Sequence, residues 1–210
     1  MLQAGGAEAL PADARLERKE IAMSTVAQAS GKLNGIDLVA LARVVRGIQG
    51  DPRRGRVGFR VHTAWRGQTR SRSTVESYTI GGHDVHRHFE IDVDEPHELF
   101  GQNTAPNPQE MMMTALNACL TVGYVVEAAV KGITLEKVEI ETAGELDLRG
   151  FLGIDPTVRP GYETIKYTVR LKGNGTPEQF QEIHETVLKT SPNYWNVSRP
   201  IRIDATLEVE

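Results

Sequence analysis

Residues 107–133 read NPQEMMMTALNACLTVGYVVEAAVKGI, and this stretch decides the fold. From Met111 to Val130 it is apolar on nearly every side, and a Lys-Gly pair then gives a normal helix end. Its length also suits a membrane span, but an Asn, a Gly and a Glu interrupt the run and acidic residues flank it. We therefore expect a long helix buried in a soluble core, with no membrane partner.

The composition of the chain is that of an ordinary globular protein. Its 210 residues suit one domain plus an extension, and 40% of them are apolar, enough to bury a core. The net charge of −4 argues against a general binder of nucleic acid or anionic membranes. The single cysteine, Cys119, excludes a disulfide framework and fits a reducing, cytoplasmic setting.

Apolar spacing predicts further elements on both sides of the long helix. A helix is expected from Ile36 to about Ile48, capped by Asn34 or Asp37. The capping box at 176–179 predicts a second helix after it. Alternating residues predict strands at 57–66, 73–80 and 85–93, which form an antiparallel meander with one wet face, and at 137–147, 163–171 and 202–209. Without regular alternation of strand and helix, this order predicts an α+β fold.

The charged residues are unevenly distributed. Seven arginines lie between residues 53 and 72, whereas residues 84–110 hold seven acids and one arginine. Two interpretations stay open: complementary charged faces on neighbouring elements or subunits, or an arginine that serves an anion-like site. A nucleic-acid interface would need interleaved aromatic residues or a known module, and the sequence has neither.

Two groups of residues have the composition of a chemical site. His83, His86 and His88 form an H-x-x-H-x-H cluster that could bind a transition metal, but the following glutamate is too close for the usual pattern. We expect a solvated strand face there, and no metal. For Cys119, position alone favours neither of two readings, a small apolar side chain in a buried helix or a reactive thiol.

Residues 92–133, DVDEPHELFGQNTAPNPQEMMMTALNACLTVGYVVEAAVKGI, resemble the OsmC/Ohr superfamily of osmotically inducible and organic-hydroperoxide-resistance proteins. The shared features are a Gly/Asn-rich loop, an N-P-x-E start, a cysteine on a helix of small residues, and G-I-x-L-x-x-V at 132–138. Thr190-Ser191-Pro192 and the segment after it match the family's C-terminal pattern. The resemblance implies an intertwined α+β homodimer, in which long central helices pack against antiparallel sheets and the sites lie between subunits.

The resemblance also divides the chain into three parts. It covers residues 57–210, which we take as the OsmC-like domain. The remainder is a flexible N-terminal arm at 1–33 and a helical extension at 34–56.

The resemblance implies a set of catalytic residues. Well-studied members reduce organic hydroperoxides through a peroxidatic cysteine, an arginine, a glutamate and a second, resolving cysteine. Cys119 matches the peroxidatic position, and Ser191 stands where the second cysteine would be. Arg70 and Arg72 are the candidate arginines.

Glu110 is the candidate acid, one position later than in the hydroperoxide reductases, where this chain has Gln109. In a regular helix it lies about 13.5 Å along the axis from Cys119 and on the opposite side. It therefore either orients an arginine or serves a structural pair.

The expected function is thiol-dependent reduction of organic hydroperoxides by a one-cysteine peroxidase, with an external thiol as reductant and no cofactor. The alternative is a non-peroxidatic protein of the same fold that binds a small apolar or thiol-reactive ligand. A third hypothesis is a metal-binding protein that uses the histidine cluster.

Overall fold

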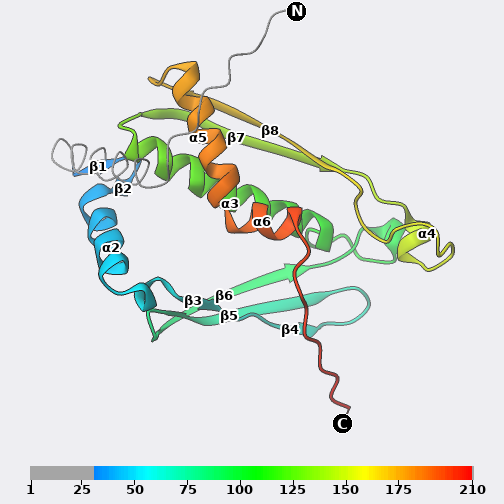
Figure 1. Ribbon diagram of the computed structural model, residues 1–210. Coiled ribbons are helices and arrows are strands. Elements are labelled where there is room, and N and C mark those ends of the chain that lie inside the picture. Colours follow the sequence, from blue (N-terminus) through cyan, green and yellow to red (C-terminus); the bar gives the residue numbers. More distant parts are fainter. Residues whose placement is uncertain (1–30, 210) are drawn as a thin grey trace, which may run out of the picture.

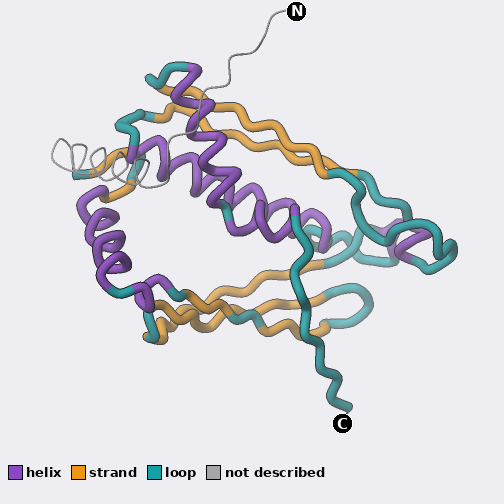
Figure 2. Tube along the Cα trace, in the orientation of Figure 1, coloured by secondary structure: helices purple, strands orange, loops and turns teal. Residues whose placement is uncertain are grey.

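A computed structural model describes residues 31–209 of the chain. Its central element is helix α3, Pro108–Val130, and two antiparallel sheets lie on opposite sides of it (Figures 1 and 2). One is the hairpin of β7, Leu135–Gly144, and β8, Ile165–Gly173. The other contains β3 to β6. This mixed arrangement of helices and antiparallel strands confirms the predicted α+β class.

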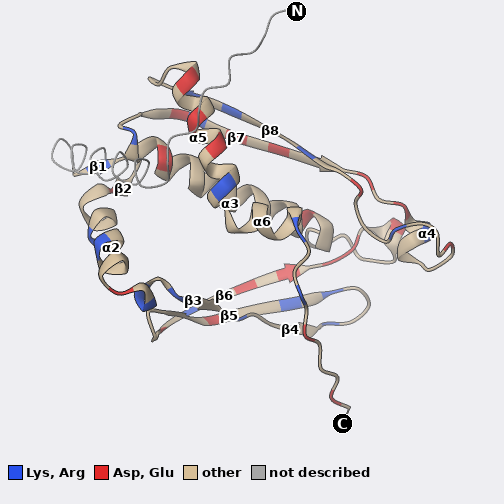
Figure 3. Cartoon of the chain, viewed as in Figure 1, with Lys and Arg blue, Asp and Glu red and all other residues tan. Residues whose placement is uncertain are grey.

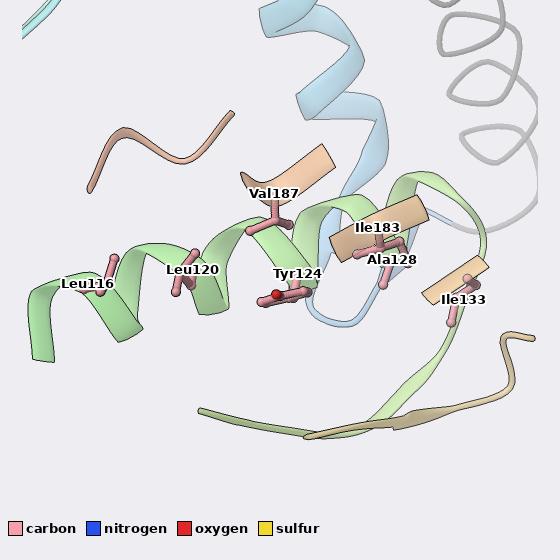
Figure 4. Close-up of a cluster of buried hydrophobic side chains, with 7 residues drawn as sticks. All are labelled: Leu116, Leu120, Tyr124, Ala128, Ile133, Ile183 and Val187. Carbon is pink, nitrogen blue, oxygen red and sulfur yellow. The ribbon is translucent and has the colours of Figure 1, made fainter. Parts of the chain in front are cut away.

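The main core forms where α3 packs against β7 and α5, Pro177–Thr190. Its buried side chains come from four consecutive turns of α3 and from the elements facing them. They are Leu116, Leu120, Tyr124, Ala128, Ile133, Ile183 and Val187 (Figure 4). A side chain at Gly123 would have its Cβ only 3.1 Å from Val187, so this glycine lets the two helices approach closely.

We expected α3 to be buried on all sides, but only one of its faces is buried. On the opposite face, small and apolar side chains stay open, and Val122 is 63% exposed. In length and composition α3 passes as a possible membrane span, but its buried face belongs to the core just described.

The N-terminal extension packs on the C-terminal end of α3. Strands β1, Lys32–Leu33, and β2, Ile36–Asp37, form a hairpin that leads into α2, Leu38–Gly50. The Asp37 side chain caps α2, one of the two predicted caps. Leu38 and Ala42 are buried against Ala129 and Val130. Of the predicted arm at 1–33, residues 1–30 lie outside the described residues, and Lys32–Leu33 is a strand.

The second sheet confirms the predicted meander with two changes. The expected first strand at 57–66 is broken into β3, Val57–Phe59, and β4, His62–Trp65, which pair with successive parts of the same edge of β5, Ser71–Ile80. Strand β6, His83–Val93, pairs with the other edge. Large apolar side chains such as Phe59 (72%) and Trp65 (74%) are exposed, so within residues 31–209 this sheet lacks the covered face that the prediction gave it.

The C-terminal part differs most from expectation. A short helix α6, Pro192–Ser198, follows α5, and α4, Leu148–Phe151, lies in the predicted loop between β7 and β8; neither was predicted. The predicted strand at 202–209 is wrong for the described chain, because these residues pair with no other strand there. Their apolar and polar residues alternate, but a strand also needs a neighbouring edge for its backbone hydrogen bonds.

Candidate functional site

The only cysteine lies in the middle of α3, and its thiol is half-buried. The Sγ atom of Cys119 is 3.3 Å from the Oγ of Ser191, a residue 72 positions later in the chain. Ser191 is buried, with 5% of its surface exposed. The structure thus brings together the two residues that the resemblance aligned with the family's pair of cysteines.

Ser191 is held in place because it joins two helices. Its backbone N–H donates to the Val187 carbonyl at the end of α5 (2.9 Å), and its Oγ accepts from the Tyr194 N–H in α6 (3.3 Å). The Asn193 side chain donates to the Ala115 carbonyl (2.8 Å) and ties α6 to α3. The hydroxyl beside the thiol is therefore fixed from both sides.

Glu110 lies at the start of α3, where it forms a capping box. Its carboxylate accepts from the Asn107 N–H (2.8 Å), and the Asn107 side chain accepts from the Glu110 N–H (2.9 Å). Of the two roles left open for Glu110, the structural pair is the one that these contacts describe.

The candidate arginines lie on β5 or just before it, and within residues 31–209 neither of them forms a hydrogen bond with Cys119. Arg72 donates two hydrogen bonds to Asp92 across the β5–β6 ladder and pairs with Glu90 at 3.1 Å. Its side-chain hydrogen bonds hold the pKa of the Asp92 carboxyl below its usual value. Figure 3 shows a blue segment of β5 beside a red segment of β6, so opposite charges face each other across this pair of strands.

Arg70 is less fully paired. One Nη donates to the Arg66 carbonyl at 3.1 Å. Its Nε is buried and has no hydrogen-bond partner among the described residues. Arg70 therefore keeps a free donor, whereas Arg72 is committed to two carboxylates.

Sequence reasoning missed Asp94, which organises the loop before α3. Its fully buried carboxylate accepts five hydrogen bonds, from the Thr69 hydroxyl, the N–H groups of Glu95, Gln102 and Thr104, and the Thr104 hydroxyl. Burial alone would raise the pKa of Asp94, but these hydrogen bonds outweigh it and lower the pKa well below the usual value. Gly101 is required here, because a Cβ would overlap the Glu95 carbonyl.

A second missed pair joins α3 to α5. The Tyr124 hydroxyl lies 2.6 Å from Nδ1 of His184, and the two rings stack. Burial is the main reason why the pKa of Tyr124 is raised. Tyrosine and histidine look like ordinary helix residues in the sequence, and no local signal pairs them.

A cavity of about 310 Å³ lies next to the thiol site. It is lined in part by Leu116, which precedes Cys119 by about one helical turn, and by Tyr194, whose backbone N–H donates a hydrogen bond to Ser191. Its wall is mostly aromatic and aliphatic: Leu116, Tyr162, Ile165, Tyr167, Tyr194, Val197 and Ser198. Such a wall suits an apolar group.

The histidine cluster lies on exposed β6. His88 is 3.9 Å from Glu90, and the three rings are solvent-exposed. Within residues 31–209 no group of three or more His, Cys, Asp or Glu side chains is arranged to hold a metal ion.

The family model for OsmC-like proteins matches residues 101–206, which include α3 with its cysteine, the β7–β8 hairpin, α5, α6, and Ser191 between these last two helices. The chain belongs to the OsmC-like family. The match covers the Cys119–Ser191 site and leaves the N-terminal extension outside. No curated protein matches the chain.

Solved structures of other OsmC-like proteins resemble this chain at low identity. An OsmC-like protein from Mycoplasma pneumoniae is 16% identical, with a TM-score of 0.49 over 65% of this chain and 84% of that one. A protein from Legionella pneumophila, described as an organic hydroperoxide resistance protein OsmC, is 17% identical, with a TM-score of 0.41 over 65% and 87% of the two chains.

Proposed function

We propose that this OsmC-like protein is a cytoplasmic homodimer that reduces organic hydroperoxides through one cysteine, Cys119, with an external thiol as reductant. The observation that carries the proposal is the pairing of a half-buried thiol with a buried hydroxyl on family-matched elements. Residues 57–210 are proposed as the catalytic domain, and the extension at 34–56 as its support.

The reaction balances with one cysteine. The Cys119 thiolate attacks the outer oxygen of the hydroperoxide, so an S–O bond forms and the O–O bond breaks. Sulfur loses two electrons, and the alkoxide leaves and takes a proton from water as the alcohol. One external thiol then displaces water from the sulfenic acid to give a mixed disulfide, and a second restores Cys119 and leaves as the external disulfide.

An arginine would contribute mainly as a donor to the departing oxygen. An ordinary thiol is only about 3% ionised at neutral pH, and a larger thiolate fraction is partly offset by lower nucleophilicity. Stabilising charge on the leaving oxygen has a larger effect. Arg70 is the better candidate, because Arg72 is already paired with Asp92 and Glu90.

The homodimer is supported by three apolar features that are exposed among the described residues 31–209. Met111, Ala115, Ala118, Val122 and Val125 share one face of α3, opposite the core, at about 100° per residue. The β3–β6 sheet exposes Phe59, Trp65 and Phe89, and the alternating segment 201–209 exposes Ile203 and Leu207. Patches of this kind mark interfaces. Cys119 borders the α3 face, so a second copy there would also enclose the thiol.

The favoured substrates are hydroperoxides with an apolar organic group, because the cavity beside Leu116 is lined by aromatic and aliphatic side chains. The same cavity favours the alternative, a non-peroxidatic protein that binds a small apolar or thiol-reactive ligand.

Peroxide-dependent oxidation of Cys119 separates these two functions. Purified protein is treated with one equivalent of cumene hydroperoxide, and sulfenic acid is trapped and located by mass spectrometry, with Cys119→Ser as the control. Turnover with a small thiol or a dithiol protein is then followed. The proposal predicts sulfenic acid on Cys119 and no turnover by a folded Cys119→Ser protein. Binding of the peroxide or its alcohol without oxidation would support the alternative.

A further inference from the structure

The Ser191 hydroxyl accepts a hydrogen bond from a backbone N–H, apart from its contact with the thiol. A serine hydroxyl has one proton to donate and two lone pairs to accept with. The Tyr194 N–H occupies one lone pair at 3.3 Å. An amide N–H cannot accept a proton, so the hydroxyl proton of Ser191 remains to be donated.

The acceptor within reach of that proton is Sγ of Cys119, at 3.3 Å. A neutral thiol can either donate or accept in this contact. A thiolate can only accept, so the Ser191 hydroxyl must be the donor in its contact with an ionised Cys119. Ser191 is 5% exposed, and its backbone is bonded to α5 and α6, so water competes little for this position.

We infer that Ser191 is a positioning residue whose hydroxyl donates a hydrogen bond to the Cys119 thiolate and so stabilises the anion. A hydrogen bond to a charged form favours that form. This inference deepens the proposed function, because the thiolate is the form that attacks a hydroperoxide. It assigns Ser191 a role of its own at the position that the family pattern gives to a second cysteine.

Three substitutions separate this role from helix capping. Ser191→Ala removes both the hydroxyl and the cap of α6. Ser191→Gly also removes the hydroxyl, but glycine is a tolerated N-cap residue. Ser191→Thr keeps both the hydroxyl and the cap. A pure capping role would affect Ala alone, whereas a role at the thiol affects Ala and Gly alike and is rescued by Thr.

The measurement is the rate of Cys119 alkylation by iodoacetamide between pH 6 and pH 10, with circular dichroism to check folding. If the hydrogen bond changes the thiol–thiolate equilibrium about 10-fold, lower nucleophilicity of the bonded thiolate offsets about 3-fold of this. The Gly and Ala variants should therefore react about 3-fold more slowly than wild type at pH 7 and about 2-fold faster at pH 10. The Thr variant should follow wild type.

The alkylation rates of the Gly variant and of wild type are thus expected to cross between pH 7 and pH 10, and this crossing is specific to the inferred contact. A variant that merely loosens the helix junction would expose the thiol and react faster at every pH. Equal rates for Gly and wild type across the range, or faster reaction of Gly at all pH values, would overturn the inference. Alkylation needs no peroxide, so a crossing without peroxide turnover would keep the Ser191 role and reject only the peroxidase.

Discussion

Glu110 and Asn107 hydrogen-bond to each other's backbone, at 2.8 and 2.9 Å, and so fix the first turn of the helix that carries Cys119. Glu110→Ala should therefore destabilise the protein by about 1 kcal/mol, the usual value of a cap contact. Glu110→Gln should be close to wild type, because glutamine also completes a capping box. Urea denaturation measures both. Loss of peroxide turnover in a fully stable Gln variant would instead assign the carboxylate a part in catalysis.

Ser191→Cys should create a disulfide with Cys119. A cysteine at this position places a sulfur where the Ser191 Oγ now lies, 3.3 Å from Sγ. After one equivalent of hydroperoxide, the Cys119 sulfenic acid should condense with the new thiol, and mass spectrometry should show the loss of two protons within one chain. The wild type should instead over-oxidise in excess peroxide. Persistent sulfenic acid in the variant would contradict a side-chain arrangement that allows the two sulfurs to meet.

Arg70→Lys should lower peroxide turnover by about 10²-fold, the loss seen when a single oxyanion donor is removed. An ammonium group cannot reproduce the planar fork of a guanidinium. Arg72→Lys is the matched control, since Arg72 already pairs with Asp92 and Glu90 and should matter mainly for the β5–β6 contact. Full activity in both variants would remove these arginines from the proposed mechanism.

Asp94 should make stability depend on acid pH. Its pKa is lower in the folded protein than in the unfolded chain, so its stabilising contribution is fully present above the unfolded value, near 3.8, and is lost as the pH falls below it. Asp94→Asn cannot be ionised and leaves the five donors less well paired. Its melting temperature should be lower than that of wild type at pH 6, and the difference should shrink at pH 3. A constant difference would contradict the lowered pKa.

Val122→Asp should dissociate the proposed dimer. Val122 is 63% exposed on the open face of α3, so the charge is harmless in a monomer and costly when a second copy covers it. Light scattering should give twice the chain mass for wild type and the chain mass, 23.2 kDa, for the variant. Thr186→Asp, on α5, is a control that should remain dimeric. A monomeric wild type would reject the dimer.

The sequence by itself determined the elements that depend on near neighbours. The extents of α3 and α5 follow from apolar spacing and from the capping boxes that begin them, and the β5–β6 hairpin follows from alternation around Gly81-Gly82. These signals act over three or four residues along a helix or across a short turn, so they can be read from the order of the residues. Cys119 was also identified in this way, through the family motif around it.

The tertiary structure decided which residues lie next to each other, and the family resemblance anticipated only the pairing of Cys119 with Ser191. The Ser191 hydroxyl lies beside the Cys119 thiol, 72 positions apart in the sequence, and the Tyr124 hydroxyl lies beside His184, 60 positions apart. Asp94 accepts hydrogen bonds both from Thr69, well before it in the chain, and from Thr104 in the loop that follows it. The alternation at 202–209 predicted a strand, yet within residues 31–209 this segment pairs with no other strand. The reason is the same in each case: a local pattern shows which conformation a segment prefers, whereas a hydrogen bond between distant residues exists only where packing brings its two groups within about 3 Å.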